Sequence, residues 1–188
     1  MRKDLGVKPA IFPMPVLMIS TYDNYNRVDV MNAAWGMMVD MNKIALNLTE
    51  SHKTVQNIKE KGAFVVSIAD FSHMVESDYF GIVSANNTPD KFEKSGLHAV
   101  KSQVVDAPII EEFPVAMECK FIEYQDDENG CGVIGEIVNV SVRDDVLDES
   151  GNIDVLRINA ILYDPFHHGY YRVGEKVGNA FQEGRKLK

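Results

Sequence analysis

Short apolar runs separated by turn residues are the feature that most limits how this chain can fold. The run Ala63–Ile68 is apolar at nearly every position, which is typical of a central strand covered on both faces. Val115–Tyr124 and Gly132–Arg143 are longer β-rich segments on either side of an acidic turn near Asp126–Gly130. Many short strands with only short helices favour a barrel or sandwich over a doubly wound sheet. We therefore predict a mainly β fold in one domain spanning residues 1–188.

Local signals place the other elements. Residues 15–31 predict a hairpin, and Ile44–Leu48 and Val100–Asp106 predict strands. We expect three short helices: one capped by Ser51 and ended by Gly62, one started by Asp70 or Ser72 and ended by Gly81, and Asp90–Ser95 ended by Gly96. In the segment 132–143 we expect buried side chains at Val138, Val140 and Val142.

Charge and hydropathy exclude several classes of protein. The net charge is −9, and the one basic cluster is Arg185–Lys188, so we expect no nucleic-acid partner. No apolar run approaches the ~18 residues of a membrane helix, and the basic start lacks the apolar segment of a secretion signal. Cys119, opposite about Glu136, and Cys131 flank the hairpin turn more than ~15 Å apart, too far for a disulfide. Two free thiols favour a cytoplasmic location.

Two motif-like patterns do not fit their usual context. Gly130–Gly135 matches G-x-G-x-x-G, but a turn precedes it and a β-rich segment follows it, whereas a dinucleotide site needs a strand and then a helix. These glycines fit a hairpin turn and a bulge better. The five histidines have no metal-ligand spacing, so we expect no metal site. No Asp, Glu or His is an evident acid or base, and we name no catalytic residue.

The segment Asn32–Asn57 has the composition that a flat, phosphate-bearing ligand needs. Hydroxyl and cationic groups stand at a predicted helix start, where backbone N–H groups favour an anion: Ser51, His52, Lys53 and Thr54. Nearby, Ala33 and Ala34 let the backbone approach a ring, and Trp35 can form a wall beside it. Ordinary helix capping and a core tryptophan explain the same residues, and composition alone does not choose between these alternatives.

An ordered set of motifs, spread over nearly the whole chain, resembles the flavin reductase-like, FMN-binding split-barrel family, and within it the flavoredoxin type. The set comprises Pro13–Val16, Asn32–Trp35, Ser51–Thr54 with Asn57 and Ile58, Asn87–Leu97, Ala107–Cys119, Gly135–Val138 and Tyr170–Gly178. The resemblance implies a Greek-key split β-barrel, usually a homodimer, with FMN in a groove near the subunit interface.

The resemblance also implies which residues bind the cofactor. The ring side would be Asn32, Ala33, Ala34, Trp35, Asn47 and Leu48, the phosphate end Thr49, Ser51, Lys53 and Thr54, and Lys91 and Tyr170 would lie in segments that close over the flavin. The chain departs from many relatives at Asp40–Lys43, where they have a Pro-Pro pair. Ala33 and Ala34 replace ring-edge hydroxyls, which leaves backbone contacts there.

The function implied is an FMN-binding oxidoreductase or electron carrier that takes electrons from NAD(P)H or from a redox partner protein. One alternative is a non-catalytic flavin-binding or sensing module on the same barrel. Another is a barrel that binds a different flat ligand, such as haem or a pyridoxal-type cofactor, through His167 or His168. The sequence contains no nicotinamide motif, so the electron donor and the final acceptor stay open.

Overall fold

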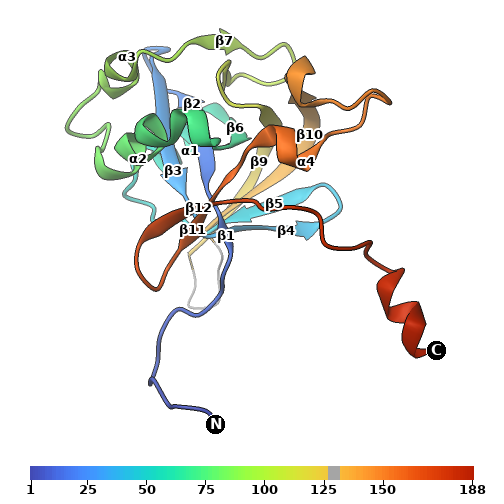
Figure 1. Cartoon of the computed structure of the whole chain (residues 1–188). Coiled ribbons are helices and arrows are strands. Elements are labelled where there is room, and N and C mark those ends of the chain that lie inside the picture. The colour runs from blue at the N-terminus through green and yellow to red at the C-terminus, as the bar shows by residue number, and fades with distance from the viewer. Residues whose placement is uncertain (127–131) are drawn as a thin grey trace.

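A curled, seven-stranded antiparallel sheet forms the body of the protein, and a computed structural model describes residues 1–126 and 132–188 (Figure 1). Its strands lie in the order β3 (Val28–Ala33), β2 (Leu17–Tyr22), β6 (Ala63–Ile68), β9 (Val115–Gln125), β10 (Gly132–Val142), β5 (Lys43–Leu46) and β4 (Gly36–Asp40). The hairpin expected at residues 15–31 is thus β2–β3, and Ala63–Ile68 is an inner strand, as predicted.

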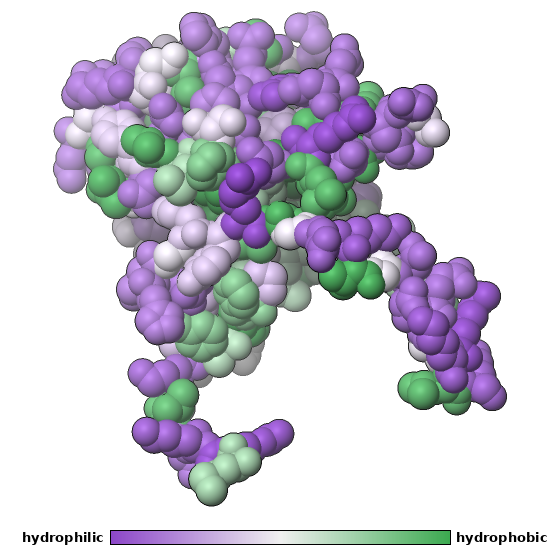
Figure 2. Space-filling model, viewed as in Figure 1, coloured by the Kyte–Doolittle hydropathy of each residue, from purple (hydrophilic) through white to green (hydrophobic). Residues whose placement is uncertain are grey.

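Smaller elements surround the large sheet. One sheet joins β1 (Met14–Pro15), β11 (Ile161–Asp164) and β12 (Gly169–Arg172), and another joins β7 (Ala99–Lys101) and β8 (Pro108–Ile110). The helices are α1 (Lys53–Lys61), α2 (Met74–Ile82), α3 (Lys91–Ser95) and α4 (Val155–Ile158), with 3-10 turns η1 (Phe71–His73), η2 (Asp144–Val146) and η3 (Glu183–Leu187). Both chain ends project from the body as exposed arms (Figures 1 and 2).

The two largest of the apolar clusters lie on the two sides of the sheet. Because side chains alternate along a strand, Leu17 and Ile19 of β2 face one cluster and Met18 faces the other. The first cluster includes Phe64 of β6 and the buried Val55 of α1. The second cluster lies under α2 and α3 and includes a stacked pair of buried rings, Phe80 and Phe92, at 6.3 Å. The helices are therefore held to the sheet by their apolar faces.

The helix predictions are confirmed in position and wrong in detail. Helix α1 ends at Gly62, whose φ of 68° and N–H bond to Ile58 O form a left-handed C-cap. The N-cap is His52 and not Ser51, and it makes no side-chain capping bond. Gly81 does not end α2, which continues to Ile82. Its role is close packing, since a Cβ there would lie 2.9 Å from Asn32 Nδ2 of β3.

Two strand predictions are also wrong in part. The strand expected at Val100–Asp106 stops at Lys101, because Ser102 Oγ accepts the N–H groups of Val104 and Val105 and turns the chain. In β10, Val140 is 49% exposed instead of buried, whereas Val138 and Val142 are partly buried against apolar clusters. The pairing of β10 with β9 places Cys119 opposite Ile137 and not Glu136.

The glycine-rich segment packs strands together. Gly130 and Cys131 lie outside the described residues, but Gly132 has a φ of 76°, and a Cβ there would meet Leu46 O at 2.7 Å. A Cβ on Gly135 would lie 2.3 Å from Phe64 Cζ, and the pairing with β9 is irregular at that point. The bulge expected here is confirmed, and a β-strand follows where a dinucleotide site needs a helix.

Among the described residues, none of the helices is long and apolar enough to cross a bilayer. The cytoplasmic location stays a prediction. The thiol of Cys119 is buried in the first cluster, and this burial, followed by the nearby charge of Glu118, raises its pKa to about 12.

Gly132→Ala should destabilise the fold more than a matched change elsewhere. Gly151 shares the positive φ, at 78°, but has open space around it. We expect Gly151→Ala to lower the free energy of unfolding by about 1 kcal/mol and Gly132→Ala by about 3 kcal/mol, since the second adds a clash with β5. Denaturant unfolding measures both. Equal losses would contradict the close approach of β10 to β5.

Candidate functional site

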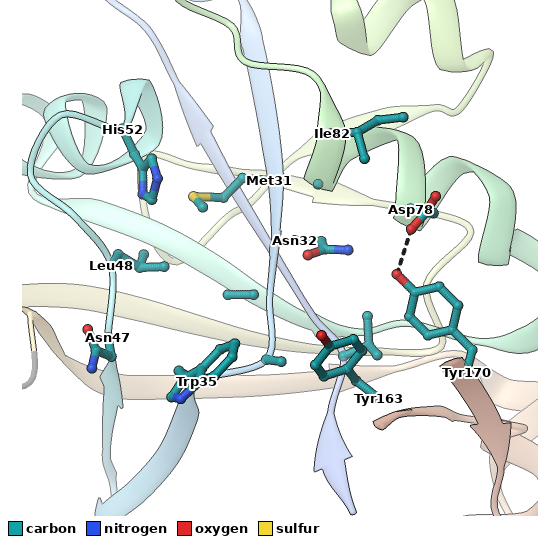
Figure 3. Close-up of a pocket in the computed structure, with 14 residues that line it drawn as sticks. Met31, Asn32, Trp35, Asn47, Leu48, His52, Asp78, Ile82, Tyr163 and Tyr170 are labelled. Carbon is teal, nitrogen blue, oxygen red and sulfur yellow. Dashed lines mark hydrogen bonds between the residues drawn. The ribbon is translucent and has the colours of Figure 1, made fainter. Parts of the chain in front are cut away.

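A cavity of about 350 Å³ lies where β3, α2 and the β11–β12 pair meet (Figure 3). Its lining includes every residue that the sequence placed at the ring side: Asn32, Ala33, Ala34, Trp35, Asn47 and Leu48. Tyr170, expected in the closing segment, also lines it. Val16, Met31, His52, Asp78, Gly81, Ile82 and Tyr163 complete the wall. The structure therefore brings the expected ring-side residues into one space.

A second cavity of about 160 Å³ continues from the first, because Met31, Asn32 and His52 line both. Its other walls carry cationic and hydroxyl groups from three segments: Lys53 and Thr54 of α1, Ser84 after α2, and Lys91 of α3. The two cavities together form a long site with an aromatic end and a cationic end. This division of chemistry suits a flat ring joined to an anion.

The cationic end coincides with the start of α1. The first intrahelical bond runs from Gln56 N–H to His52 O, so the N–H groups of Lys53, Thr54 and Val55 precede it. Such groups, with the helix dipole, favour an anion. The hydroxyl of Thr54 donates to Asp29 Oδ2 at 2.6 Å, which leaves the Thr54 backbone N–H as its donor toward the cavity.

The other expected phosphate-end residues differ in their placement. Thr49 and Ser51 line neither cavity, although Ser51 O accepts Asn86 Nδ2 at 3.1 Å and ties a loop to the start of α1. Lys91 lines the cationic cavity with a side chain that is only 3% exposed, and its ammonium lies 3.2 Å from Asp29 Oδ1. The structure thus brings Lys53, Thr54 and Lys91 together and leaves Thr49 and Ser51 aside.

Three aromatic rings line one side of the large cavity. The Trp35 and Tyr163 centroids are 6.5 Å apart, and those of Tyr163 and Tyr170 are 6.3 Å apart. Trp35 is half-exposed and not a core residue; it also lines an apolar cavity of about 250 Å³ beside β4. Trp35 therefore stands between the site and a second apolar hollow.

A hydrogen bond crosses the aromatic end of the site. Tyr170 of β12 donates its hydroxyl to Asp78 Oδ1 of α2 at 2.7 Å (Figure 3). Partial burial of the phenol, and then the bond to the Asp78 carboxylate, raise the pKa of Tyr170 to about 12. This bond holds the β11–β12 pair against α2, and both residues line the cavity.

The histidines occupy different places around the site. His52 lines both cavities, and its position in the Ser51–Thr54 motif was the signal in the sequence for this placement. His168 Nδ1 lies 2.6 Å from Tyr163 Oη, and the His167 side chain is 85% exposed. Neither His167 nor His168 lines the cavities described above, so the alternative of a haem or pyridoxal ligand held by them gains no support.

Asp78, Gly81 and Tyr163 are site residues that sequence reasoning missed. Asp78 and Gly81 lie on α2, which carried only ordinary helix signals, and the contact of α2 with β3 is a long-range one. The hydrogen bond from Asn32 Nδ2 to Ser77 O, at 3.0 Å, fixes that contact. The cluster of aromatic residues from Tyr163 to Tyr171 was the one signal in the sequence for the wall that the β11–β12 pair forms.

The curled sheet with an elongated site at its edge is the arrangement of a split β-barrel. In agreement, residues 10–171 match the model of the flavin reductase like domain family. The chain belongs to this family, and both the family resemblance and the split-barrel fold expected from the sequence are confirmed.

Individual relatives extend this comparison. Flavoredoxin of Desulfovibrio vulgaris (Miyazaki F) has 35% sequence identity and a TM-score of 0.92, covering 98% of this chain and 100% of its own. An FMN-binding domain of a flavin reductases-like enzyme from Shewanella baltica has 19% identity and a TM-score of 0.78, covering 88% of each chain. An uncharacterized protein of Aeropyrum pernix is 28% identical over 74% of this chain, which spans 54% of that relative's length.

Asp78→Asn should lower the pKa of Tyr170 from about 12 toward the ordinary 10, because the carboxylate that opposes phenolate formation is lost while burial remains. Since the folded phenol keeps its proton to a higher pH than an unfolded one, its contribution to stability is complete below pH 10 and is lost toward pH 12. Phenolate absorbance against pH measures the pKa, and Tyr170→Phe identifies the signal. An unchanged titration in Asp78→Asn would contradict the bond.

Proposed function

We propose that this protein is an FMN-binding oxidoreductase or electron carrier of the flavoredoxin and flavin reductase type. Electrons would come from NAD(P)H or from a redox partner protein and pass through bound FMN. The observation that carries this proposal is the continuous pair of cavities, about 350 and 160 Å³, with aromatic walls at one end and Lys53, Lys91 and a helix start at the other. A flavin ring and its phosphate have this arrangement of chemistry.

The residues of the site have distinct parts in this proposal. Bound FMN would supply the redox chemistry. Asn32 and Asn47 would hydrogen-bond the ring or ribityl chain, and the backbone at Ala33 and Ala34 would approach the ring edge. Trp35 and Tyr163 would exclude water from one face of the ring. Lys53, Lys91 and the first N–H groups of α1 would bind the phosphate.

Named relatives support the same proposal. A protein named flavoredoxin shares 35% identity over 98% of this chain, and a more distant structure with the same fold is described as an FMN-binding domain. A flavin mononucleotide carries a phosphate, so both names are consistent with a site that has a cationic end.

Lys53→Ala should weaken FMN binding about tenfold and leave riboflavin binding unchanged, because Lys53 would contact the phosphate that riboflavin lacks. The purified protein should show flavin absorption, or gain it when FMN is added. Lys120→Ala is a matched control, since Lys120 is exposed on β9 and lines neither cavity. A protein that stays colourless with excess FMN would overturn the proposed function.

Mixing the FMN-loaded protein with NADH or NADPH in a stopped-flow instrument separates the catalytic proposal from the alternative of a flavin-binding or sensing module. An oxidoreductase that uses a nicotinamide bleaches its flavin absorption rapidly. A flavin that stays oxidised with both nicotinamides and with a reduced ferredoxin-type donor favours the non-catalytic module.

We also propose that the protein is a homodimer that pairs through β4. This edge strand and the turn after it expose Met37, Met38, Val39 and Met41 by 64%, 48%, 47% and 94%. The apolar hollow of about 250 Å³ beside Trp35 and Met37 continues this surface. A contiguous apolar surface that includes an unpaired strand edge is typical of a subunit interface.

The double variant Met37→Glu with Val39→Glu should be monomeric, because it buries two charges in the proposed interface. Light scattering after size-exclusion chromatography measures the mass, 21.1 kDa for one chain. Val100→Glu on β7 is the control and should stay dimeric, since Val100 is 43% exposed but lies away from β4. A wild-type protein that is monomeric at micromolar concentration would contradict the proposal.

A further inference from the structure

A buried ion pair lies behind the cationic cavity. Asp29 of β3 is 3% exposed and Lys91 of α3 is 2% exposed, and 3.2 Å separate Lys91 Nζ from Asp29 Oδ1. Among the described residues, Asp29 Oδ1 accepts no well-aligned hydrogen bond, so the contact is mainly electrostatic. Lys91 Nζ donates instead to Val83 O at 3.1 Å. The ammonium of Lys91 therefore lies close to the Asp29 carboxylate without donating a hydrogen bond to Oδ1.

The other oxygen of Asp29 fastens α1 to the sheet. Oδ2 accepts the Thr54 hydroxyl at 2.6 Å and the Asn57 amide at 3.3 Å. The same amide nitrogen of Asn57 donates to Thr21 Oγ1 of β2 at 3.1 Å. Because these bonds fix the carboxylate, Asp29 cannot follow Lys91 if the ammonium moves toward the cavity.

The ammonium of Lys91 lies between the cationic cavity and the carboxylate of Asp29, and this order determines how the ion pair affects a bound anion. Lys91 and Thr54 line the cationic cavity, and Asp29 does not. An anion in the cavity would thus meet Lys91 first and have Asp29 behind it. His52 and Lys53 line the cavity as well, and among the described residues its lining includes no acidic side chain. Asp29 is the carboxylate that an anion there would compete with.

We propose that Asp29 is a resident counter-ion that competes with the cofactor phosphate for Lys91 and so lowers the affinity of the site for FMN. This inference rests on the proposed function and adds a residue to it that would not touch the cofactor. In the empty site the carboxylate compensates a buried ammonium, which alone would be strongly destabilising. In the filled site its negative charge opposes the phosphate. Asp29 is a positioning residue that keeps the flavin exchangeable.

The test compares the affinities of FMN and riboflavin in the wild type and in Asp29→Asn. Removal of one negative charge near a binding anion changes its affinity by about tenfold or more, as for titrating groups with a charged neighbour. We expect the FMN-to-riboflavin affinity ratio to rise about tenfold in Asp29→Asn, and to fall in Lys91→Gln. A ratio that is unchanged or lower in Asp29→Asn overturns the inference, because an ordinary structural role would weaken both ligands alike.

Glu118→Gln is the matched control. Glu118 is 2% exposed, accepts bonds from Ser102 and Asn139, and lines neither cavity. Its neutralisation removes a buried carboxylate of similar exposure, so stability should fall while the affinity ratio stays the same. A rise in Glu118→Gln equal to that in Asp29→Asn would also overturn the inference.

A stability measurement covers the case in which Asp29→Asn folds poorly. Inorganic phosphate should raise the midpoint of thermal unfolding of Asp29→Asn more than that of the wild type. If the variant is unfolded without ligand, FMN should restore the folded state and riboflavin should not; restoration by neither overturns the inference. Wild-type protein that binds neither flavin overturns the proposed function itself, which is a separate outcome.

Discussion

The hydrogen bond from Thr54 to Asp29 is the contact on which both ends of the site depend. It joins the first turn of α1 to the start of β3, and both partners are buried. The same strand carries Met31 and Asn32 into the large cavity, and the same helix turn carries Lys53 into the small one. A buried polar bond is costly to break, so the distance between the aromatic and cationic ends is set by the core and not by surface loops.

Helix α2 closes the opposite wall through close packing and two polar contacts. Gly81 lets the helix approach β3, and Asn32 donates to the backbone at Ser77. Tyr170 reaches α2 from β12, more than ninety positions away in the chain, and bonds Asp78. The site is thus assembled from three units, the large sheet, α2 and the β11–β12 pair, which these contacts hold together.

Periodicity and turn chemistry sufficed to predict most elements. The β2–β3 hairpin, the inner strand β6 and the left-handed caps at Gly62 and Gly96 follow from local residue types. Local residue patterns could not predict the strand pairing or where strands end: the β9–β10 register shifts near Gly135 and near Ile137, and Ser102 ends β7 early. The residues that the family resemblance placed at the ring side, Asn32–Trp35, Asn47 and Leu48, line one cavity. Asp29, Asp78 and Tyr163 could not be predicted, since each joins the site through contacts between distant segments.

The burial of Cys119 affects how readily its thiol reacts with oxidants. Only the thiolate form of a cysteine reacts readily with peroxides, and a pKa of about 12 keeps this sulfur protonated in any cellular compartment. Cys119 therefore carries its sulfur in a form that reacts slowly with peroxides, and the packing of the first apolar cluster around it is preserved when oxidants are present.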